Sequence, residues 1–444
     1  MNLRKHLYFA IVNLRGQALG AHYKRFLREA REGIAPETTR KLLIRLLTHC
    51  QQSVPYYAQI MKERGESYKE DPEEYLRSFP ILTKELIRNN FDALKSSDLP
   101  KRKWYFNTSG GSTGEPARFI QDWDYAARAG AIKLLFSKFA ADKEIGESEI
   151  VFWGAERDIT GSKNRLAAQF MTALANTTIL SVFRLEPEMI RDYIRILNKK
   201  KPRLITGYAS SMHEMARAAE RSNLYVDPQH AIITSAGTLY PFMRETVERV
   251  FQCKIYDRYG SREVGDIACE RPGHEGYWVA PWGNYLEIVD EHNNRVTDGT
   301  RGEILVTSLS NYSMPLIRYQ IGDRGVLSPS SKENSQILAE ILGRTYDVFI
   351  NRTGSAIEAG YFMPLLYFRD WIAKYQVVQK SPACILFRIV RSAASFSQTE
   401  LDDISVGAKK IMHDNYCEVL FEFVDEIPTC NSGKFRFIMS EVQH

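Results

Sequence analysis

The hydrophobic positions of the first hundred residues recur at helical spacing. Four leucines between Leu42 and Leu47 repeat with the period of an amphipathic helix, and Thr38 and Thr39 before them are its expected caps. The apolar run Leu7–Val12 predicts the buried face of an N-terminal helix, not a signal peptide. We therefore predict that residues 1–95 are mostly helical.

From about residue 100, short apolar runs alternate with helical segments. The runs are bounded by Gly, Asp or Pro, as are the buried strands of α/β domains. They lie at 150–153, 178–183, 204–206, 231–234 and 254–256. Between about 277 and 327 the pattern becomes richer in strands, and Asp298-Gly299 predicts a hairpin turn there.

The pattern divides the chain into two predicted domains. A large N-terminal α/β domain with a β-rich subdomain is expected over residues 1–343. A small α+β domain is expected over residues 344–444, with the hinge near 343–350.

Composition narrows the class of protein. Of the 444 residues, 44% are hydrophobic and 25% are charged, which excludes a disordered, collagen-like or coiled-coil chain. The net charge of +5 is small for this length and does not favour a nucleic-acid partner. Six cysteines without a C-x-x-C pair predict reduced thiols in a cytoplasmic protein. No apolar run approaches the roughly 20 residues of a membrane span.

The segment Thr108–Pro116, with the sequence TSGGSTGEP, predicts a phosphate-binding loop. Its glycines let the backbone approach a ligand, and its hydroxyls and backbone N–H groups can surround phosphate oxygens. The segment is not a Walker A loop, because Glu115 stands where that motif has lysine. A plain Gly/Ser turn between strands is the alternative interpretation.

The segment Tyr256–Gly265 follows a β-type run, so it predicts ligand contacts at the carboxyl end of a strand. Its carboxylate, Glu263, is a candidate Mg²⁺ ligand, because Mg²⁺ prefers oxygens from one or two acids plus phosphates. A solvated or salt-bridged acid is the alternative for Glu263. Three further segments, each weak alone, follow at Pro315–Asp323, Gly343–Asp347 and Asn431–Arg436.

In this order, the five segments resemble the motifs of the adenylate-forming superfamily of acyl-CoA synthetases, peptide-synthetase adenylation domains and luciferases. The resemblance covers residues from about 104 to 436. It is closer to the phenylacetate–CoA ligase branch, including its capsular-polysaccharide-type homologues. The segments that favour this branch are Ser53–Tyr57, Phe79–Lys84 and the Tyr-Gly-Ser-Arg-Glu form of Tyr259–Glu263.

The resemblance implies an ATP-dependent reaction assisted by Mg²⁺. A carboxylate would attack the α-phosphate to give an acyl-adenylate and pyrophosphate, and the acyl group would then pass to coenzyme A. An amine, a hydroxyl or a carrier-protein thiol is the alternative acceptor. A nucleotide-binding scaffold without catalysis is a third interpretation, which the intact Lys434, Glu263 and Asp323 disfavour.

The resemblance also implies a role for each matching residue. Lys434, on a mobile small domain, would bridge the acyl oxygen and the α-phosphate, and Glu263 would bind Mg²⁺. Tyr259 would stack on adenine, Asp323 would accept hydrogen bonds from the ribose, and Arg344 would support the ribose or phosphate side. The full set of implied ATP contacts is Thr108, Ser109, Gly110, Gly111, Ser112, Thr113, Gly114, Ser235, Ala236, Gly237, Asp257, Tyr259, Gly260, Asp323 and Arg344.

The acid pocket is expected at Trp153, Tyr208 and Gly260. The two rings favour a small or aromatic acid, and ordinary core packing is the alternative for both. Two positions depart from the family pattern. The family often has an acid two residues after Gly-Arg, where this chain has Tyr346 and then Asp347, which leaves the pivot residue open. The threonine common before the motif glutamate is Arg262 here.

We predict no structural zinc. Many members of this branch take a Cys and a His after the Tyr-Gly motif together with a C-x-C pair. This chain keeps Cys269 and His274 but has no cysteine over 328–335, and Cys253 offers at most a third ligand. Structural zinc almost always takes four protein ligands, so the set is too small.

Overall fold

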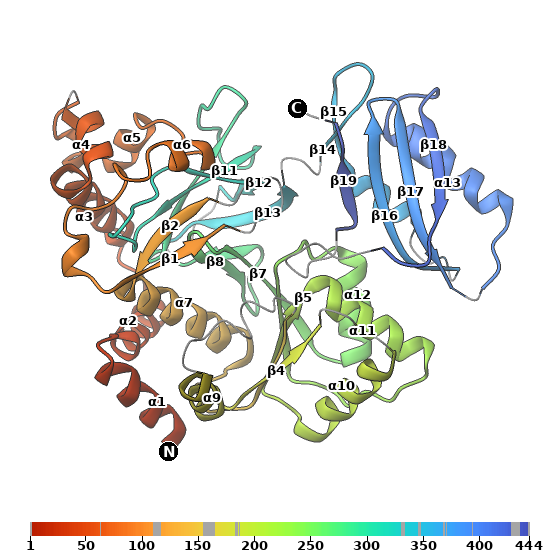
Figure 1. Ribbon diagram of the computed structural model, residues 1–444, viewed down its shortest axis with the longest axis horizontal. Coiled ribbons are helices and arrows are strands. Elements are labelled where there is room, and N and C mark those ends of the chain that lie inside the picture. The colour runs from red at the N-terminus through yellow and green to blue at the C-terminus, as the bar shows by residue number, and fades with distance from the viewer. Residues whose placement is uncertain are drawn as a thin grey trace. The chain divides into compact units, whose positions relative to one another are not determined.

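The computed structural model divides the chain into two compact units, Met1–Leu342 and Gly343–His444 (Figure 1). The structure describes every residue except 1, 63, 110–116, 154–164, 183–184, 186, 330–333, 345–347, 367–368, 370, 393, 428–435 and 443–444.

The first unit begins with helices, as predicted. They are α1 (Leu3–Leu14), α2 (Leu19–Glu32), α3 (Thr38–Ser53), α4 (Pro55–Lys62), α5 (Pro72–Arg77) and α6 (Lys84–Asn89), with short 3₁₀ turns η1 (Ser67–Lys69) and η2 (Leu99–Lys101). Leu43, Leu46 and Leu47 on α3 are fully buried, which confirms the leucine pattern. The predicted threonine caps are wrong, because α3 starts at Thr38 itself and no side chain caps it. On α1, Phe9 and Val12 form the buried face and Leu7 is exposed.

The centre of this unit is a large mixed sheet. In the described residues its order is β10-β11-β12-β13-β9-β8-β7-β6-β5-β3-β4. The strands are β3 (Glu149–Trp153), β4 (Thr177–Ser181), β5 (Leu204–Tyr208), β6 (Ala231–Ser235), β7 (Lys254–Ser261), β8 (Gly265–Glu270), β9 (Tyr277–Val279), β10 (Asn284–Val289), β11 (Arg301–Ser308), β12 (Tyr319–Leu327) and β13 (Ile337–Arg344). The strands β3 to β7 are parallel, and β7 pairs antiparallel with β8.

Helices cover both faces of the parallel strands. One face, here called the α7 face, packs Leu204, Ala231 and Ile233 against the end of α7 (Trp123–Ala141). The opposite face, here called the α11 face, packs against α10 (Pro187–Lys200), α11 (Ala209–Arg221) and α12 (Pro241–Phe251), which lie together in Figure 1. A further helix, α9 (Arg165–Leu174), precedes β4. This is the predicted α/β arrangement.

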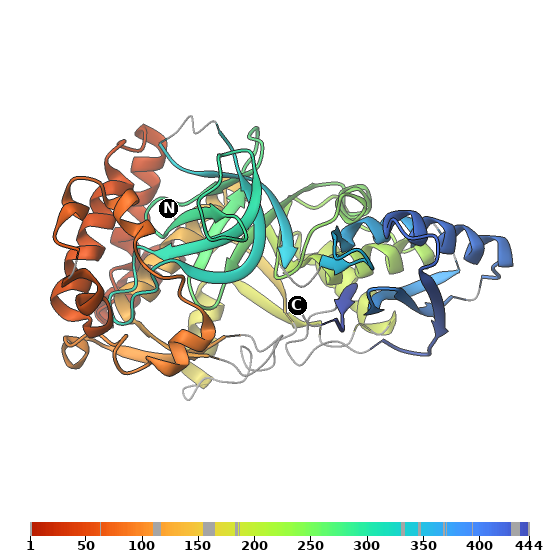
Figure 2. The ribbon, with the colours of Figure 1, turned by 90° about the horizontal axis from the view of Figure 1, so that it is seen from above.

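The strand-rich region lies beside the N-terminal helices (Figure 2). Leucines of α3 and residues of β10, β11 and β12 share one hydrophobic core. The strands β10 and β11 are antiparallel, and the predicted turn between them contains Gly299 at φ +92°. A separate hairpin, β1 (Trp104–Thr108) with β2 (Arg118–Asp122), precedes α7.

The second unit is α+β. Its sheet has the order β18-β17-β16-β19, from β16 (Ile372–Ser381), β17 (Cys384–Arg391), β18 (Glu418–Phe423) and β19 (Ile438–Ser440). The short strands β14 (Val348–Ile350) and β15 (Ala356–Glu358), the 3₁₀ segment η4 (Ala359–Leu366) and helix α13 (Gln398–Ile411) complete it. Ser397 and Glu400 form a capping box at the start of α13. In the part of the chain that the structure describes, no helix could cross a membrane.

Candidate functional site

The predicted acid and adenine contacts gather at one edge of the parallel strands. Because these strands run in one direction, their carboxyl ends meet at the same edge. Trp153 ends β3, Tyr208 ends β5 and Ser235 ends β6. The rings of Trp153 and Tyr208 lie with their centroids 4.6 Å apart. The structure thus brings together two of the three residues of the predicted acid pocket, one from each of two neighbouring strands.

The turn Ser235-Ala236-Gly237 leaves this edge with strained backbone. Ala236 has φ +68°, in the left-handed region that an L-residue enters at a cost of about 1–2 kcal/mol. Such strain persists where the surrounding structure enforces it, and it is common at ligand contacts. The predicted adenine-side residues therefore form a fixed turn directly after β6.

Two predicted nucleotide contacts from distant parts of the chain meet here. The Tyr259 hydroxyl on β7 donates a hydrogen bond of 2.8 Å to Asp323 Oδ2 on β12. These residues stand 64 positions apart, so only the sheet brings them together. The Tyr319 hydroxyl donates to Glu263 Oε1 at 3.3 Å, which places the predicted Mg²⁺ ligand beside the start of β12.

The structure corrects the position of the second motif. It was expected to follow its strand, but β7 runs on to Ser261 and turns through Arg262–Val264 into β8. Gly260 is required by this hairpin, since a Cβ there would lie 2.6 Å from the carbonyl oxygen of Gly265. The apolar run that predicted this strand ends where the polar residues of the motif begin. The sequence pattern therefore could not show that the strand continues through those residues.

The phosphate-loop candidate is closed at its base. The Ser109 N–H donates to the Ala117 carbonyl, and the Ala117 N–H donates to Ser109 Oγ, both at 2.9 Å. Behind the base, the side chain of Asn107 donates to Gln121, whose amide donates in turn to the backbone carbonyl of Glu263. Hydrogen bonds therefore connect β1, which ends at Thr108, and β2 to the turn that carries Glu263.

Asp257 lies inside the protein, on the α11 face. Its Oδ1 accepts a hydrogen bond from Thr234 at 2.8 Å and its Oδ2 accepts one from Tyr277 at 3.0 Å. The pKa of Asp257 is raised to about 7, and burial is the largest cause of this increase. In the structure, both oxygens of this buried carboxyl group therefore accept hydrogen bonds from protein hydroxyls.

Several predicted residues lie outside the described residues or have only their backbone described. Lys434, Gly110 to Gly114, Tyr346 and Asp347 belong to the first group, and Arg344 to the second. Cys269 packs in an apolar core. The described residues contain no group of three or more His, Cys, Asp or Glu that could hold a metal. The absence of zinc remains a prediction.

Arg318 of the third motif has a structural role that sequence analysis missed. Its guanidinium is buried, contacts Glu287 at 3.1 Å and donates to the Phe79 carbonyl at 2.9 Å. Tyr57 donates to the Pro315 carbonyl at 3.0 Å. The two branch-specific segments near the start of the chain therefore brace the strand that carries Asp323. In the sequence, the two segments indicated only the branch of the family, and nothing in them indicated their contacts with Arg318 and Pro315.

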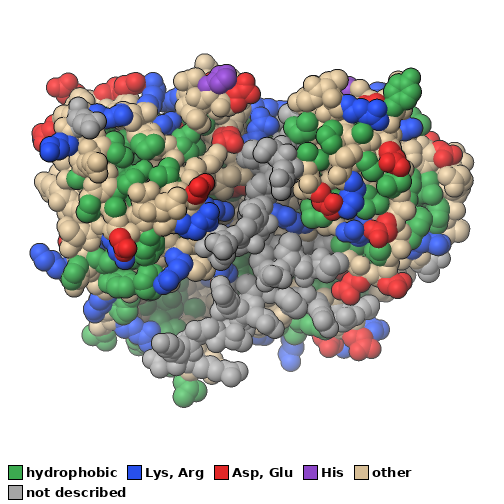
Figure 3. All heavy atoms as spheres, turned by 45° about the horizontal axis from the view of Figure 1, so that its top comes forward, with side chains coloured by type: hydrophobic (Ala, Val, Ile, Leu, Met, Phe, Trp, Pro, Cys, Tyr) green, Lys and Arg blue, Asp and Glu red, His purple; other side chains and the backbone are tan. Residues whose placement is uncertain are grey.

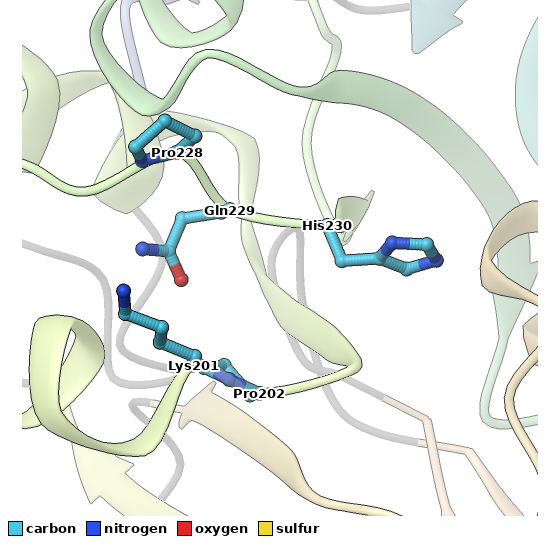
Figure 4. Close-up of a pocket in the computed structure, with 5 residues that line it drawn as sticks. All are labelled: Lys201, Pro202, Pro228, Gln229 and His230. Carbon is cyan, nitrogen blue, oxygen red and sulfur yellow. The ribbon is translucent and has the colours of Figure 1, made fainter.

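A recess of about 210 Å³ lies away from this edge (Figure 4). Its lining residues, Lys201, Pro202, Pro228, Gln229 and His230, precede the amino ends of β5 and β6. Ligands of open α/β sheets bind at carboxyl ends, so we do not assign this recess to the site.

Acidic and basic side chains are interspersed on the face shown in Figure 3, as a net charge of +5 leads one to expect.

Comparisons with known proteins agree with this fold. The family model described as the CapK C-terminal domain matches residues 349–441. Protein CapK of Staphylococcus aureus is 25% identical over 396 residues, which cover 87% of this chain and 85% of CapK. The phenylacetate-coenzyme A ligase of Aromatoleum evansii is 25% identical over 319 residues, which cover 68% of this chain and 69% of the relative.

Among solved structures, 2-hydroxyisobutyryl-CoA ligase in the postadenylation state in complex with R3-HIB-AMP has a TM-score of 0.70. The match covers 91% of this chain and 89% of that one, and at 18% identity it shows a shared fold. The chain is therefore similar in sequence to CapK and to the phenylacetate–CoA ligases. Its fold is that of the adenylate-forming ligases.

Proposed function

We propose that this protein uses ATP to convert a small carboxylic acid to an acyl-adenylate and then transfers the acyl group to coenzyme A. The observation that carries the proposal is the hydrogen bond between Tyr259 and Asp323. It fixes an aromatic ring and a carboxylate at one point of the carboxyl edge, as an adenine-stacking residue and a ribose acceptor require. We place the reaction in the cytoplasm.

Each residue supplies one step of the binding. Asp323, a carboxylate acceptor, would take hydrogen bonds from the ribose hydroxyls. Tyr259 keeps that carboxylate in place through its hydroxyl, and its ring would stack on the base. The loop that starts at Thr108 and Ser109 would hold the β- and γ-phosphates with its N–H groups.

The residues present suit a magnesium ion that arrives with ATP. Glu263 is buried and offers carboxylate oxygen, and Mg²⁺ in such sites needs only one or two carboxylates in addition to phosphate oxygens. When bound, the ion neutralises negative charge as pyrophosphate leaves. Lys434, carried by the small C-terminal domain over residues 344–444, would approach the acyl oxygen and the α-phosphate as a mobile point charge.

The acid would lie against Trp153 and Tyr208, two rings that favour a small or an aromatic acid. Two similar proteins support this choice of reaction. One is named for phenylacetate and coenzyme A, and the other holds an acyl-AMP. The acceptor is coenzyme A in this proposal. An amine, a hydroxyl or a carrier-protein thiol is the alternative, which the same assay separates.

The test is pyrophosphate release from ATP against a panel of carboxylic acids, with and without coenzyme A. We expect release that depends on the acid, and a thioester only when coenzyme A is present. Adenylate formation followed by enzyme-dependent transfer to an amine, and not to coenzyme A, would support the alternative acceptor. ATP binding without pyrophosphate release for any acid would overturn the proposal.

A further inference from the structure

Helix α1 is apolar on two opposite sides. On its inner side, Phe9 and Val12 are buried in the core that the helix shares with α2. On its outer side, Leu3, Leu7 and Leu14 are 70%, 46% and 88% exposed. These leucines are four and seven residues apart, so they share one side of the helix, opposite Phe9 and Val12.

The exposed leucines form a continuous apolar surface. Ala10, which is also exposed, lies between Leu7 and Leu14 on the same side. From Leu3 to Leu14 the helix rises by about 16 Å. We call Leu3, Leu7, Ala10 and Leu14 the outer face of α1. Single exposed leucines are ordinary, but an apolar surface that follows a whole helix indicates an interaction site.

Helix α9 packs beside α1 and is exposed in the same way (Figure 1). Its Met171 packs against the core that holds Phe9 and Val12. Leu166 and Phe170 are 82% and 55% exposed, and they share one side of α9 because they are four residues apart. Two neighbouring helices of the first unit therefore each present large hydrophobic side chains to solvent.

Positive charge borders the outer face of α1. Arg4 is three residues from Leu7 and Arg15 is four residues from Ile11, so both arginines follow the same border of the outer face. Both are exposed, and within the described part of the chain neither forms an ion pair. The first 28 residues contain six Lys or Arg and no Asp or Glu.

The acidic residues nearest to α1 do not neutralise this border. Gly146, in the loop after α7, lies against the Cβ of Arg4. On one side of Gly146, Glu144 pairs with Lys5, a cation on the inner side of α1, at 2.8 Å. On the other side, Glu147 accepts a hydrogen bond from the backbone N–H of Glu144 at 2.6 Å. In the described residues, no ion pair joins either carboxylate to Arg4.

We propose that the outer face of α1 binds the surface of a membrane that contains anionic lipids. The helix would lie in the plane of the membrane surface, with its leucines at the boundary between headgroups and acyl chains. Arg4 and Arg15 would lie at the level of the lipid phosphates, whose negative charge they complement. Because the inner side of α1 stays in the core, binding requires no rearrangement of the fold.

A second copy of the chain fits this face less well. Two copies that met through the outer face would bring Arg4 and Arg15 of both copies together, and α1 carries no acid that could pair with them. The inference goes beyond the proposed function and does not depend on it.

The test measures how much protein sediments with lipid vesicles. Vesicles of phosphatidylcholine alone are compared with vesicles of phosphatidylcholine and phosphatidylglycerol. We expect binding to the anionic vesicles to be at least about tenfold tighter, because each basic side chain near such a surface contributes about fivefold. Added salt should weaken this binding, since it screens exposed charges.

The apolar contribution is tested at the two most exposed leucines. Leu3→Gln combined with Leu14→Gln should weaken binding to anionic vesicles by at least about tenfold. Leu3→Met combined with Leu14→Met keeps apolar side chains and should bind as the wild type does. Tyr225→Gln combined with Val406→Gln removes two comparably exposed apolar side chains elsewhere and should change nothing. Denaturant unfolding should give the same free energy for the leucine variants and the wild type.

The charge contribution is tested separately. Arg4→Gln combined with Arg15→Gln should weaken binding to anionic vesicles by about tenfold or more and leave binding to phosphatidylcholine unchanged. Arg191→Gln combined with Arg195→Gln removes an equal charge from exposed positions on α10 and is the matched control.

Equal binding to both kinds of vesicle, or binding to neither, would overturn the inference. Losses in the control variants as large as those in the α1 variants would overturn it as well. A lipid-free dimer that Leu3→Gln with Leu14→Gln converts to a monomer, measured by light scattering and accompanied by no vesicle binding, would assign the outer face to a second copy instead. None of these outcomes depends on pyrophosphate release.

Discussion

The two faces of the same parallel strands differ in chemistry. On the α11 face, β3, β5, β6 and β7 present Ile150, Phe152, Ile205, Ile232 and Ile255, each at most 2% exposed. On the α7 face, the same strands present Glu149, Thr206 and Arg258 beside apolar residues such as Leu204 and Ile233. The Thr206 hydroxyl donates to Glu149, and Lys143 pairs with that carboxylate.

The two faces differ in how far they follow the usual composition of parallel sheets. Parallel strands with helices on both faces are ordinarily apolar on both, because burying charge without full compensation costs free energy. The α11 face follows that rule except at the buried pair Asp257 and Thr234. The α7 face departs from it at Glu149, a carboxylate that Thr206 and Lys143 compensate.

The largest expected effect tests the α11 face. Ile150→Ala removes a fully buried side chain and should reduce the free energy of unfolding by about 2–5 kcal/mol, measured by denaturant unfolding. Val151→Ala, on the adjacent residue and opposite face, should cost clearly less, because Val151 is smaller and only partly buried. Equal losses for the two variants would show that β3 packs its side chains as tightly on the α7 face as on the α11 face.

The next effect concerns chemistry alone. Lys434→Ala should slow adenylate formation by about a hundredfold or more, the scale of losing one preorganised charge-stabilising group. Thioester formation from supplied acyl-adenylate should be far less affected, since the lysine would act in the first half-reaction. Lys380→Ala, which removes a lysine paired with Glu441, is the control. Equal losses in both half-reactions would remove Lys434 from the proposed mechanism.

A smaller effect concerns the pH dependence of stability, which tests the buried carboxyl group of Asp257 on the α11 face. The pKa of Asp257 is about 7 in the folded protein against an ordinary value of 3.8, so the folded state holds its proton longer than the unfolded chain. Stability should therefore fall as pH rises, by about 2 kcal/mol between pH 5 and pH 7.

Asp257→Asn keeps an acceptor for Thr234 and removes the titration. Unfolding measured at pH 5 and pH 7 should show the decrease in the wild type and little of it in the variant. The same decrease in both proteins would show that Asp257 does not titrate in this range.

Local pattern predicted much of the fold. The helical period of Leu43, Leu46 and Leu47 and the apolar runs of β3, β5 and β6 carried enough information, because each is set by neighbours in sequence. The continuation of β7 to Ser261 was not predictable, since that part of the strand is stabilised by antiparallel pairing with β8, not by its own pattern.

The candidate site was predictable only in part. Tyr259 and Asp323 were named from the family resemblance, but their direct contact depends on pairing within a long sheet. Gln121 was not named at all, and only the folded structure shows that its amide joins the base of the phosphate-loop candidate to the Glu263 turn.

The central claim is that ATP binds where Tyr259 on β7 contacts Asp323 on β12, and its most direct test is the ATP dissociation constant of Asp323→Ala. Loss of a carboxylate that bonds the ribose costs about 1.5–3 kcal/mol, so we predict binding weaker by about tenfold to a hundredfold. Glu340→Ala, which removes an exposed carboxylate paired with Arg301 on the same sheet, should leave the constant unchanged. An unchanged dissociation constant in Asp323→Ala, or an equal change in Glu340→Ala, would contradict the account.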